Sequence, residues 1–457
     1  MTNMKEITDL QHHVAPLSHG GKIVVIDPGA TLDAEATAML QALHSRSTEG
    51  IDGHLKVLAE RGAEKFMSTY YVQYGHKSIG DCGTAVVFVE GISMLAAKAI
   101  QDSRLYNGQE ASTRYIDFAH QPFLDPIGNE ESAATLERWR TFYLEAVAEM
   151  KEVLPERFPM QEGEKETSYT KAIAARAFDI TRGFLPAGAS TNLAWSSTLR
   201  QFGDRIMELR HHPLAEVREI SQVLEEAMIA SYPNSFNTEK KRYEKTESYL
   251  ERTTNYYYYH DAESPELALV HDGVNHTALT DYQELFASRP PKTELPKWLA
   301  AYGTASFAFT LDFGSFRDIQ RHRAVVQRMP LLTSELGFHE WYLNELTDSL
   351  RDKAVQLLAE QADIAETLTD DSALRQYYLP MGYNISNYLT GDLPALAYLV
   401  ELRASSLVHP TLAMRSSEMA QLLTTTYGDS LGLTLHLDPE PGRFNVKRGE
   451  ADIIKKD

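Results

Sequence analysis

Hydrophobic and polar residues follow two different periods along the chain, so the pattern predicts both strands and helices. Short apolar runs punctuated by Gly or Pro predict buried strands over residues 21–28 and 85–93. Strong helix formers with apolar residues at helical spacing predict helices over 32–46, 52–73, 93–104 and 131–153, and three helical pieces within 171–231. The mixture predicts an α+β protein.

The longest predicted helix, 131–153, is amphipathic. Its apolar face is formed by Leu136, Trp139, Phe142, Tyr143, Val147 and Met150. Residues 75–84 are small, polar and rich in glycine, which predicts a loop. Residues 236–265 are charged and then rich in tyrosine, without a helical period, which predicts a connection or an extra strand.

A series of short motifs occurs twice in the same order, which predicts an internal repeat. The first copy has Leu185-Pro-Ala-Gly188, Glu208-Leu-Arg210, His212-Pro213 and Glu219. The second copy has Leu379-Pro-Met-Gly382, Glu401-Leu-Arg403, His409-Pro410 and Glu418. We therefore expect an N-terminal arm over 1–20 and two tandem copies of one domain, over 21–268 and 269–457.

Composition narrows the functional classes. The 457 residues include 44 Lys plus Arg and 64 Asp plus Glu, a net charge of −20, which argues against a general nucleic-acid or anionic-membrane surface. Cys82 is the one cysteine, so an intrachain disulfide is impossible and a reducing, cytoplasmic location is expected. The N-terminus lacks an apolar signal segment, and no apolar run is long enough to span a membrane.

A basic cluster, Arg321-His322-Arg323, lies within the segment 316–328, at the polar end of an apolar stretch. On a continuous helix the two arginines would lie about 200° apart, so both can face one ligand only where the helix ends. Two separately directed guanidinium groups around an imidazole suit an extended ligand with several phosphates and a polar ring. The alternative is a solvated helix face on which Asp318 pairs with Arg321 and His322.

Glu110-Ala-Ser112-Thr-Arg114-Tyr115 places a carboxylate, a hydroxyl and a guanidinium within a short stretch, which suits a nucleotide monophosphate. The alternative is a turn in which Arg114 pairs with Glu110. Upstream, His76, Ser78 and Asp81 could form a proton relay in the predicted loop. The alternative there is a helix N-cap made by Ser78 or Asp81.

Three other features favour structural interpretations. His211-His212-Pro213 lacks further ligands at metal-binding spacing, so we expect a chain turn and no metal. The run Tyr256–Tyr259 could stack on a flavin or a base, but such runs are more often packed strand residues. Cys82 has no His at an activating distance in sequence, so we expect a small buried residue.

These motifs together resemble those of the flavin-dependent thymidylate synthases, and the resemblance is divided between the halves. The first half has the His76 loop, with Asp81 and Cys82 where the family has Glu and His, and the nucleotide element Glu110–Tyr115. It also has Arg182, but Asp102-Ser103-Arg104 stands at the position of the Arg-His-Arg triplet. The second half has the complete triplet and Arg403 as the match of Arg210, but Val325–Thr333 replaces the nucleotide element and Gln376 replaces Arg182.

The resemblance implies two copies of an α+β domain with helices around a small, mostly antiparallel sheet. It implies that Arg321, His322 and Arg323 contact FAD, with His76, Ser78 and Asp81 nearby. It further implies that Glu110, Ser112, Arg114 and Arg182 hold dUMP. Either Arg210 or Arg403 would complete that pocket, and the catalytic candidates are therefore His76, His322, Arg210 and Arg403.

By the same resemblance, NADPH reduces the flavin, methylenetetrahydrofolate supplies the one-carbon unit, and dUMP becomes dTMP without a cysteine nucleophile. The family builds its sites at the interfaces of a homotetramer, so a tandem chain is expected to form a homodimer that imitates the tetramer. Two alternatives remain open. One is modification of another pyrimidine nucleotide; the other is a non-catalytic nucleotide- or flavin-binding module, because neither half is complete.

Overall fold

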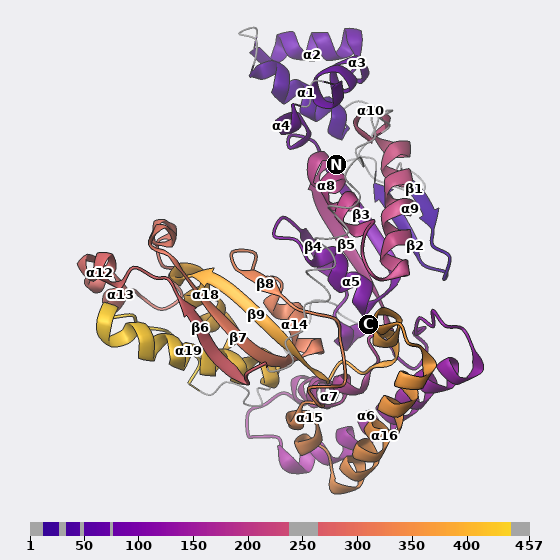
Figure 1. Cartoon of the computed structure of the whole chain (residues 1–457), viewed down its shortest axis with the longest axis vertical. Helices are drawn as coiled ribbons and strands as arrows, with labels where there is room; N and C mark the ends of the chain where they lie inside the picture. Colours follow the sequence, from indigo (N-terminus) through magenta and orange to yellow (C-terminus); the bar gives the residue numbers. More distant parts are fainter. Residues whose placement is uncertain (1–11, 27–32, 46–49, 74–75, 237–263, 440–457) are drawn as a thin grey trace. The chain divides into compact units, whose positions relative to one another are not determined.

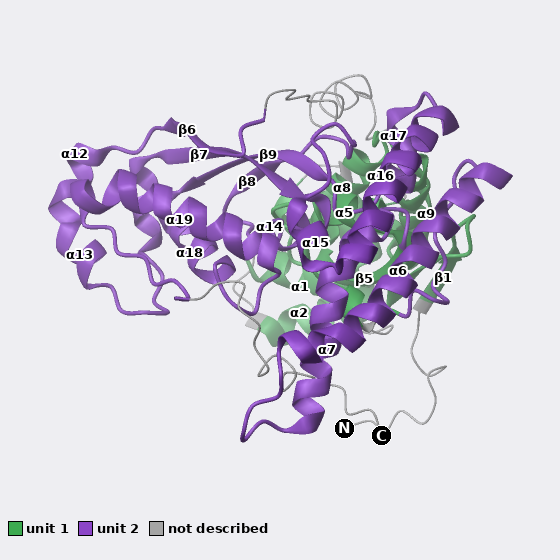
Figure 2. Ribbon diagram, turned by 90° about the horizontal axis from the view of Figure 1, so that it is seen from below, with its two compact units in different colours: residues 1–116, 190–255 green, residues 117–189, 256–457 purple. Residues whose placement is uncertain are grey.

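The computed structural model describes residues 12–26, 33–45, 50–73, 76–236 and 264–439 (Figure 1). The chain folds into two compact units, each made of two separate stretches (Figure 2). Unit 1 comprises residues 1–116 and 190–255, and unit 2 comprises 117–189 and 256–457. Each unit therefore contains residues from the first predicted repeat.

Unit 1 contains a five-stranded antiparallel sheet with the strand order β1-β2-β3-β5-β4. Its strands are β1 (His12–Pro16), β2 (Lys22–Ile26), β3 (Thr84–Ser93), β4 (Asn107–Glu110) and β5 (Ser190–Thr198). The predicted strands over 21–28 and 85–93 are confirmed as β2 and β3. The helical prediction for 171–231 is wrong over β5, where alternate residues including Leu193 and Trp195 are buried.

The helical elements of unit 1 differ mostly in length from those that the sequence predicts. They are α1 (Ala34–His44), α2 (Gly50–Arg61), α3 (Glu64–Phe66), the π-helix η2 (Met67–Gln73), α4 (Lys77–Gly80), α5 (Met94–Gln101), the 3₁₀-helix η3 (Thr113–Tyr115), α8 (Leu199–Leu209), α9 (Ala215–Ser231) and α10 (Pro233–Phe236). The predicted continuous helix over 52–73 is wrong because Gly62 adopts φ +65°, which ends α2. Part of the predicted loop 75–84 forms α4.

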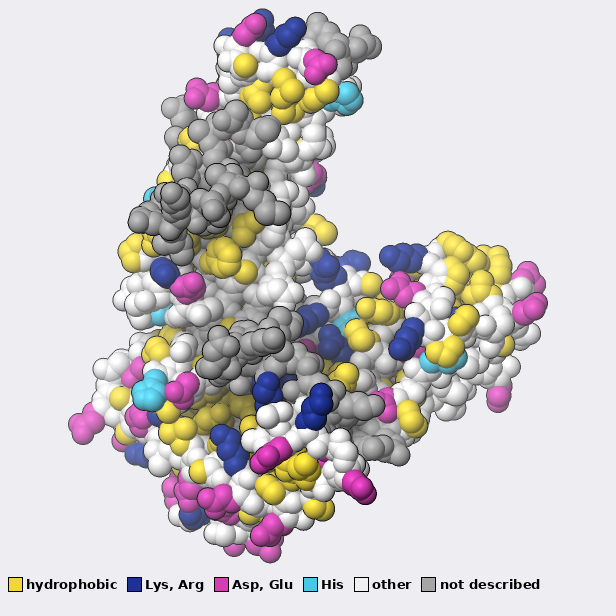
Figure 3. Space-filling view, turned by 180° about the vertical axis from the view of Figure 1, so that it is seen from behind, with side chains coloured by type: hydrophobic (Ala, Val, Ile, Leu, Met, Phe, Trp, Pro, Cys, Tyr) yellow, Lys and Arg dark blue, Asp and Glu magenta, His cyan; other side chains and the backbone are white. Residues whose placement is uncertain are grey.

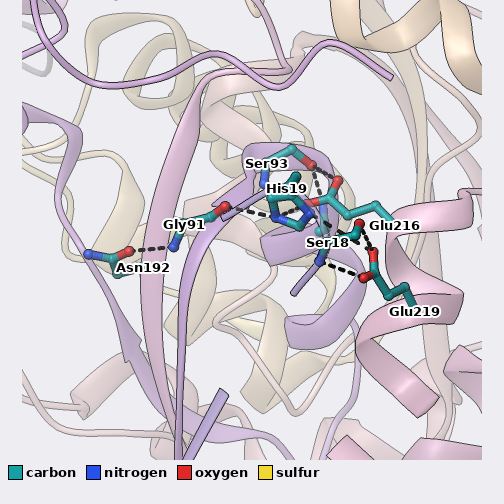
Figure 4. Close-up of polar contacts among 8 residues, drawn as sticks. Ser18, His19, Gly91, Ser93, Asn192, Glu216 and Glu219 are labelled. Atoms are coloured by element: carbon teal, nitrogen blue, oxygen red, sulfur yellow. Dashed lines mark hydrogen bonds and ion pairs between the residues drawn. The ribbon is translucent and has the colours of Figure 1, made fainter. Parts of the chain in front are cut away.

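A β-bulge in β3 fixes where α5 leaves the sheet (Figure 4). Gly91, at φ +70°, donates its backbone N–H to Oδ1 of Asn192 at 2.8 Å, and its carbonyl lies 3.0 Å from Nε2 of His19. The Glu216 carboxylate of α9 accepts from the N–H of Ser93 at 2.8 Å and from its hydroxyl at 2.6 Å. Ser93 is the N-cap of α5, so this network joins the sheet, α5 and α9.

Unit 2 contains a four-stranded antiparallel sheet with the order β6-β7-β9-β8. Its strands are β6 (Leu267–Asp272), β7 (Thr304–Asp312), β8 (Val326–Arg328) and β9 (Asn384–Asp392). The helices α18 (Leu393–Arg403) and α19 (Pro410–Leu431) pack against this sheet (Figure 1). The core between them includes Phe307, Phe309, Leu389, Leu399 and Leu423.

The remaining helices of unit 2 come from both halves of the sequence. They are α6 (Glu130–Arg157), α7 (Glu166–Thr181), η4 (Arg182–Phe184), α12 (His276–Leu279), η5 (Thr280–Tyr282), α13 (Gln283–Ser288), η6 (Lys297–Tyr302), α14 (Phe313–Ile319), α15 (Glu340–Glu345), α16 (Asp348–Leu368), α17 (Ser372–Arg375) and η7 (Gln376–Tyr378). The predicted helix over 131–153 is confirmed as α6, which lies against α16 (Figure 1). In the part of the chain that the structure describes, no helix is long and apolar enough to cross a bilayer.

The two Leu-Pro motifs lie against each other inside unit 2. The N–H of Ala187 donates to the carbonyl of Leu379, and the N–H of Met381 donates to the carbonyl of Leu185, both at 2.9 Å. Pro186 and Pro380 form an antiparallel bridge between these bonds. The two motifs thus exchange equivalent hydrogen bonds.

The next residue of each motif repeats this relationship. Gly188 donates its N–H to the carbonyl of Tyr377 at 3.1 Å, and Gly382 donates to the carbonyl of Gly183 at 2.7 Å. A Cβ atom on Gly188 would lie 2.7 Å from the Tyr377 oxygen, and one on Gly382 would lie 2.9 Å from the Gly183 oxygen. Because the backbones approach so closely, both positions require glycine.

Candidate functional site

The Arg-His-Arg triplet follows the C-terminal end of α14. Asp312 caps this helix by accepting from the N–H of Ser315 at 3.0 Å, and α14 ends at Ile319. The turn that follows is closed by the N–H of His322, which donates to the carbonyl of Ile319 at 2.9 Å. The triplet therefore lies just past a helix end, which is the condition for its two arginines to serve one ligand.

His322 is the buried member of the triplet, with 8% of its surface exposed, whereas Arg321 and Arg323 are exposed. Its Nε2 accepts a hydrogen bond from Nε of Arg403 at 2.8 Å. The ring of Tyr398, also in α18, lies 5.7 Å from the imidazole ring, centroid to centroid. Burial and the charge of Arg403 lower the pKa of His322 to about 3, so the imidazole is neutral near pH 7.

Asp318 is the acidic centre of the site. One of its oxygens lies 3.7 Å from Nη1 of Arg403 and 3.9 Å from Nε of Arg321. Burial favours the neutral acid, but four arginines outweigh it and lower the pKa of Asp318. We call these residues the arginine cluster: Arg182, Arg317, Arg321 and Arg403. The alternative of a solvated helix face predicted an ion pair between Asp318 and Arg321, and this ion pair is present. The same carboxylate also pairs with Arg403.

Arg182 connects the first half of the sequence to this cluster. Its Nη2 donates to the hydroxyl of Ser315 in α14 at 2.9 Å. Burial opposes its charge, but Tyr342, Asp312 and Asp179 outweigh that effect, so its pKa is raised. The Nε of Arg182 is buried, and no described residue accepts its hydrogen bond. The guanidinium is thus a permanent, partly buried cation with an unused donor.

The residues around Arg182 form a buried polar network. The hydroxyl of Ser315 also lies 2.8 Å from that of Thr411 in α19. The hydroxyl of Tyr342 donates to Oδ2 of Asp312 at 2.8 Å. Burial, followed by the charge of Asp312, raises the pKa of Tyr342, which keeps this hydroxyl protonated as a donor.

Gln376, the residue expected to correspond to Arg182 in the second half, has a different environment. Its side-chain oxygen accepts from the N–H of Leu332 at 2.9 Å, and its amide donates to the carbonyl of Ala373 at 3.1 Å. Leu332 belongs to the segment that replaces the nucleotide element. The neutral amide therefore holds this segment in place and provides no charge for an anionic ligand.

The nucleotide element lies in unit 1, at the end of β4. Glu110 is buried, and its Oε2 accepts from Nε2 of Gln101 at 2.7 Å. Ser112 is exposed and Arg114 is half-buried in η3. At Asp102-Ser103-Arg104, where the first half is expected to lack the triplet, Asp102 forms an ion pair with Lys98 at 3.6 Å, and burial lowers the pKa of Lys98.

The loop with His76 is also in unit 1. His76, Ser78 and Asp81 are exposed around α4, while Gly75 lies outside the described residues. The expected N-cap is wrong, because Asp81 follows the C-terminal end of α4 and Ser78 lies within it. Asp81 instead forms an ion pair with Arg200 at 2.8 Å.

Arg210 and Arg403 make different contacts. Arg403 is the last residue of α18 and contacts His322. Arg210 comes one residue after α8 and forms an ion pair with Glu225 of α9. The turn expected at His211–Pro213 is confirmed, because the N–H of His212 donates to the carbonyl of Leu209 at 3.1 Å.

The remaining sequence-based expectations have mixed outcomes. Cys82 is half-buried, and its thiol donates to the carbonyl of Ser78 at 3.5 Å. The tyrosine run 256–259 lies outside the described residues. Sequence reasoning missed the contributions of Ser315, Tyr342 and Tyr398. Only Ser315 offered a signal, because it lies in the helix that the triplet ends.

Apolar side chains reach the surface beside charged ones, as the yellow and dark blue atoms of Figure 3 show. In the described part of unit 2 these include Tyr398 and Leu402, one turn apart on α18, and Val326 of β8. Tyr398 is 45% exposed and lies next to His322. The triplet therefore has both cationic groups and an exposed aromatic ring around it.

Part of the chain is similar to a known protein family. Residues 29–234 match the model of a family described as "Thymidylate synthase complementing protein". Residues 29–234 are thus similar to this family, and the match confirms the family resemblance over the residues that it covers. The matched segment includes the His76 loop, the nucleotide element, Arg182 and Arg210.

Relatives extend the similarity beyond this segment. A UPF0159 protein of Chlamydia pneumoniae is 25% identical over 406 residues, which cover 76% of each chain. A UPF0159 protein of Chlamydia muridarum is 26% identical over 410 residues, with the same coverage. A UPF0159 protein of Thermoplasma acidophilum is 22% identical over 503 aligned positions, covering 94% of this chain and 99% of the relative. The names of these relatives state no activity.

Proposed function

We propose that the protein is a flavin-dependent thymidylate synthase that methylates dUMP to dTMP. The observation that carries this proposal is the contact of Arg182, from the family-matched segment, with α14, the helix that ends at the Arg-His-Arg triplet. It brings an expected nucleotide residue of the first half to the expected flavin element of the second half. Methylenetetrahydrofolate would supply the one-carbon unit and NADPH the reducing equivalents.

The chemistry of the cluster fits an anionic, ring-containing ligand. The buried Nε of Arg182 has no acceptor among the described residues, and the phosphate of a nucleotide is the acceptor that guanidinium groups favour. Tyr398 offers an exposed aromatic face next to a neutral imidazole, which suits a flat heterocycle. FAD would supply the redox chemistry, while the protein binds and orients.

The proposed roles rest on the family resemblance, together with the environments of Arg182 and His322. Arg321, His322 and Arg323 would bind FAD, with His76, Ser78 and Asp81 nearby. Glu110, Ser112, Arg114 and Arg182 would bind dUMP. Either Arg403 or Arg210 would complete the dUMP pocket. Arg403 is favoured, because it contacts His322 whereas Arg210 pairs with Glu225.

We further propose that the chain is a tandem duplication with repeats over 21–268 and 269–457, after an arm over 1–20. The order of elements supports it, since β3-α5-β4 and β5-α8-α9 of the first half are followed by β7-α14-β8 and β9-α18-α19 of the second. The reciprocal hydrogen bonds between the Leu-Pro motifs support it as well, because two related copies would exchange such bonds about a twofold axis. In a duplicated chain each site needs one intact version of each element.

Two observations favour a second candidate, a non-catalytic nucleotide- or flavin-binding protein. Asp81 is engaged by Arg200, and Arg210 is engaged by Glu225, so two expected site residues already have ion-pair partners. Modification of another pyrimidine nucleotide is a variant of the main proposal, since Asp81 departs from the family pattern. For either enzyme we propose a cytoplasmic homodimer without nucleic-acid or membrane partners.

A flavin spectrum tests the binding of FAD and the choice of pyrimidine nucleotide, and growth of a thymidine auxotroph tests catalysis. The purified full-length protein is expected to show the absorbance bands of bound FAD, and titration with dUMP is expected to perturb them. A flavin-loaded protein whose bands respond to another pyrimidine nucleotide and not to dUMP would redirect the proposal to that substrate. A well-folded protein that binds neither FAD nor dUMP would contradict it.

A further inference from the structure

The contact between Arg403 and His322 defines the protonation pattern of the imidazole. A guanidinium group carries only hydrogen-bond donors, so Nε2 of His322 must accept the 2.8 Å bond from Nε of Arg403 through an unprotonated lone pair. In a neutral imidazole the proton then resides on Nδ1. Arg403 therefore selects one of the two neutral tautomers.

The environment keeps the ring in this neutral form. His322 is buried, and Arg403 places a positive charge at hydrogen-bond distance, so both effects disfavour an imidazolium ion. Asp318 favours the imidazolium, but its effect is the smallest of the three. Tyr398 covers the ring from α18 and adds no charge.

Asp318 in turn orients Arg403. Its carboxylate lies 3.7 Å from Nη1 of Arg403, while Nε of the same guanidinium contacts His322. Asp318 lies four residues before His322, so one short segment holds both the imidazole and the acid that aligns its partner. Arg321 shares this acid at 3.9 Å, and among the described contacts it makes none with the imidazole ring.

The remaining imidazole nitrogen is available to a ligand. The described hydrogen bonds of His322 are made by its backbone groups and by Nε2, and no described residue accepts from Nδ1. A neutral N–H donor differs from the neighbouring guanidinium groups, which attract anions. It suits a carbonyl oxygen or an unprotonated ring nitrogen.

We infer that Arg403 is a positioning residue that holds His322 as the Nδ1–H tautomer and so presents a neutral donor to a carbonyl or ring nitrogen of a heterocyclic ligand. The arginine cluster would then bind the phosphate of the ligand, and His322 would recognise its heterocyclic ring. The identity of the ring as flavin or pyrimidine rests on the proposed function. The tautomer itself does not, because Arg403 imposes it without ligand.

The tautomer is measurable by NMR on the full-length, ligand-free protein with ¹⁵N-labelled histidine. Long-range ¹H–¹⁵N correlations distinguish a protonated from an unprotonated ring nitrogen, and His322→Gln identifies the signals. At pH 7 we expect a protonated Nδ1 and an unprotonated Nε2. Arg403→Met removes the donor, so a tautomer mixture and a raised pKa of His322 are expected. Arg403→Lys, which can still donate, should restore part of the wild-type pattern.

Arg321→Met is the matched control, because it removes an equal charge beside Asp318 without removing the donor to His322. The wild-type pattern should persist in that variant. A protonated Nε2 or an imidazolium in the wild-type protein at pH 7 would overturn the inference even if Arg403→Met did not fold. An unchanged pattern in a folded Arg403→Met protein would overturn it as well.

Ligand binding keeps this inference distinct from the proposed function. If the wild-type protein shows the expected tautomer but binds neither FAD nor dUMP, the function fails and the positioning role stands. If it binds both ligands with the opposite tautomer, the positioning role fails and the function stands. With both in place, Arg403→Met should weaken ring binding about tenfold, the effect of one lost hydrogen bond.

Discussion

Arg182 and Ser315 are separated by 133 residues in sequence, yet the guanidinium of one donates a 2.9 Å hydrogen bond to the hydroxyl of the other. The contact joins a residue just after α7, within the family-matched segment, to the helix that ends at the Arg-His-Arg triplet. Under the proposed duplication, contacts of this kind would combine the elements that each half keeps. Both residues lie in unit 2, so the contact is internal to one compact body.

Replacing Arg182 with Gln should weaken dUMP binding by about tenfold to a hundredfold, the range for hydrogen bonds to a charged group. Titration of the flavin spectrum with dUMP measures this change. Arg351→Gln is the control, since Arg351 in α16 pairs with Asp348 and its Nε donates to the carbonyl of Leu343. A folded Arg182→Gln protein with wild-type dUMP affinity would remove Arg182 from the nucleotide site.

The division of ligands between the halves predicts two different losses. His322→Ala should lose bound FAD, because it removes the buried centre of the triplet. Arg114→Ala should retain FAD and lose dUMP, because its guanidinium belongs to the nucleotide element. Flavin absorbance after gel filtration and dUMP titration measure the two properties. If both substitutions lowered stability and left both affinities unchanged, the idea of a divided site would be wrong.

The crossing of the Leu-Pro motifs should tolerate no side chain at its glycines. Gly382→Ala places a Cβ atom against the ring of Phe338 and 2.9 Å from the Gly183 carbonyl, and Gly188→Ala meets two carbonyl oxygens. Each should lower the free energy of unfolding by about 1–3 kcal/mol, as overpacking does. Gly428→Ala in α19, whose nearest neighbour would be 3.5 Å away, should be neutral or stabilising. Thermal unfolding compares the three; equal effects would contradict the close backbone approach.

The lowered pKa of His322 makes stability depend on pH. The unfolded chain protonates this imidazole below about pH 6.5, whereas the folded chain does so only near pH 3. The free energy of unfolding is therefore highest above pH 6.5. It falls as the pH decreases toward 3, by up to about 1.4 kcal/mol per pH unit. Between pH 7 and 5 the wild-type protein should lose about 2 kcal/mol more than His322→Gln in denaturant unfolding. Equal losses would mean that the folded imidazole titrates normally.

The sequence predicted the elements whose apolar pattern is strong and local. The helix over 131–153 and the strands over 21–28 and 85–93 were correct because their buried faces repeat at the period of one secondary structure. β5 was missed because Ser190-Thr-Asn-Leu-Ala-Trp-Ser-Ser-Thr198 is largely polar, and its burial comes from a central place in the sheet between β3 and β4. The amino-acid composition of β5 does not indicate that the strand lies between two others.

The sequence predicted several candidate residues of the site but not the contacts between their side chains. Motif order identified Arg182 and the triplet, and it placed Arg403 and Arg210 as alternatives. The donor from Arg403 to His322 depends on α18 ending beside the turn after α14, which is a tertiary relationship. Tyr342 reaches Asp312 from a helix that the sequence pattern did not single out, so its role required the structure.

Growth of a thymidine auxotroph that expresses the full chain tests the central claim most directly. The wild-type protein should support growth without thymidine, and Arg114→Ala, expressed at the same level and loaded with FAD, should not. Failure of a folded, flavin-loaded wild-type protein to support growth would contradict the assignment as a thymidylate synthase.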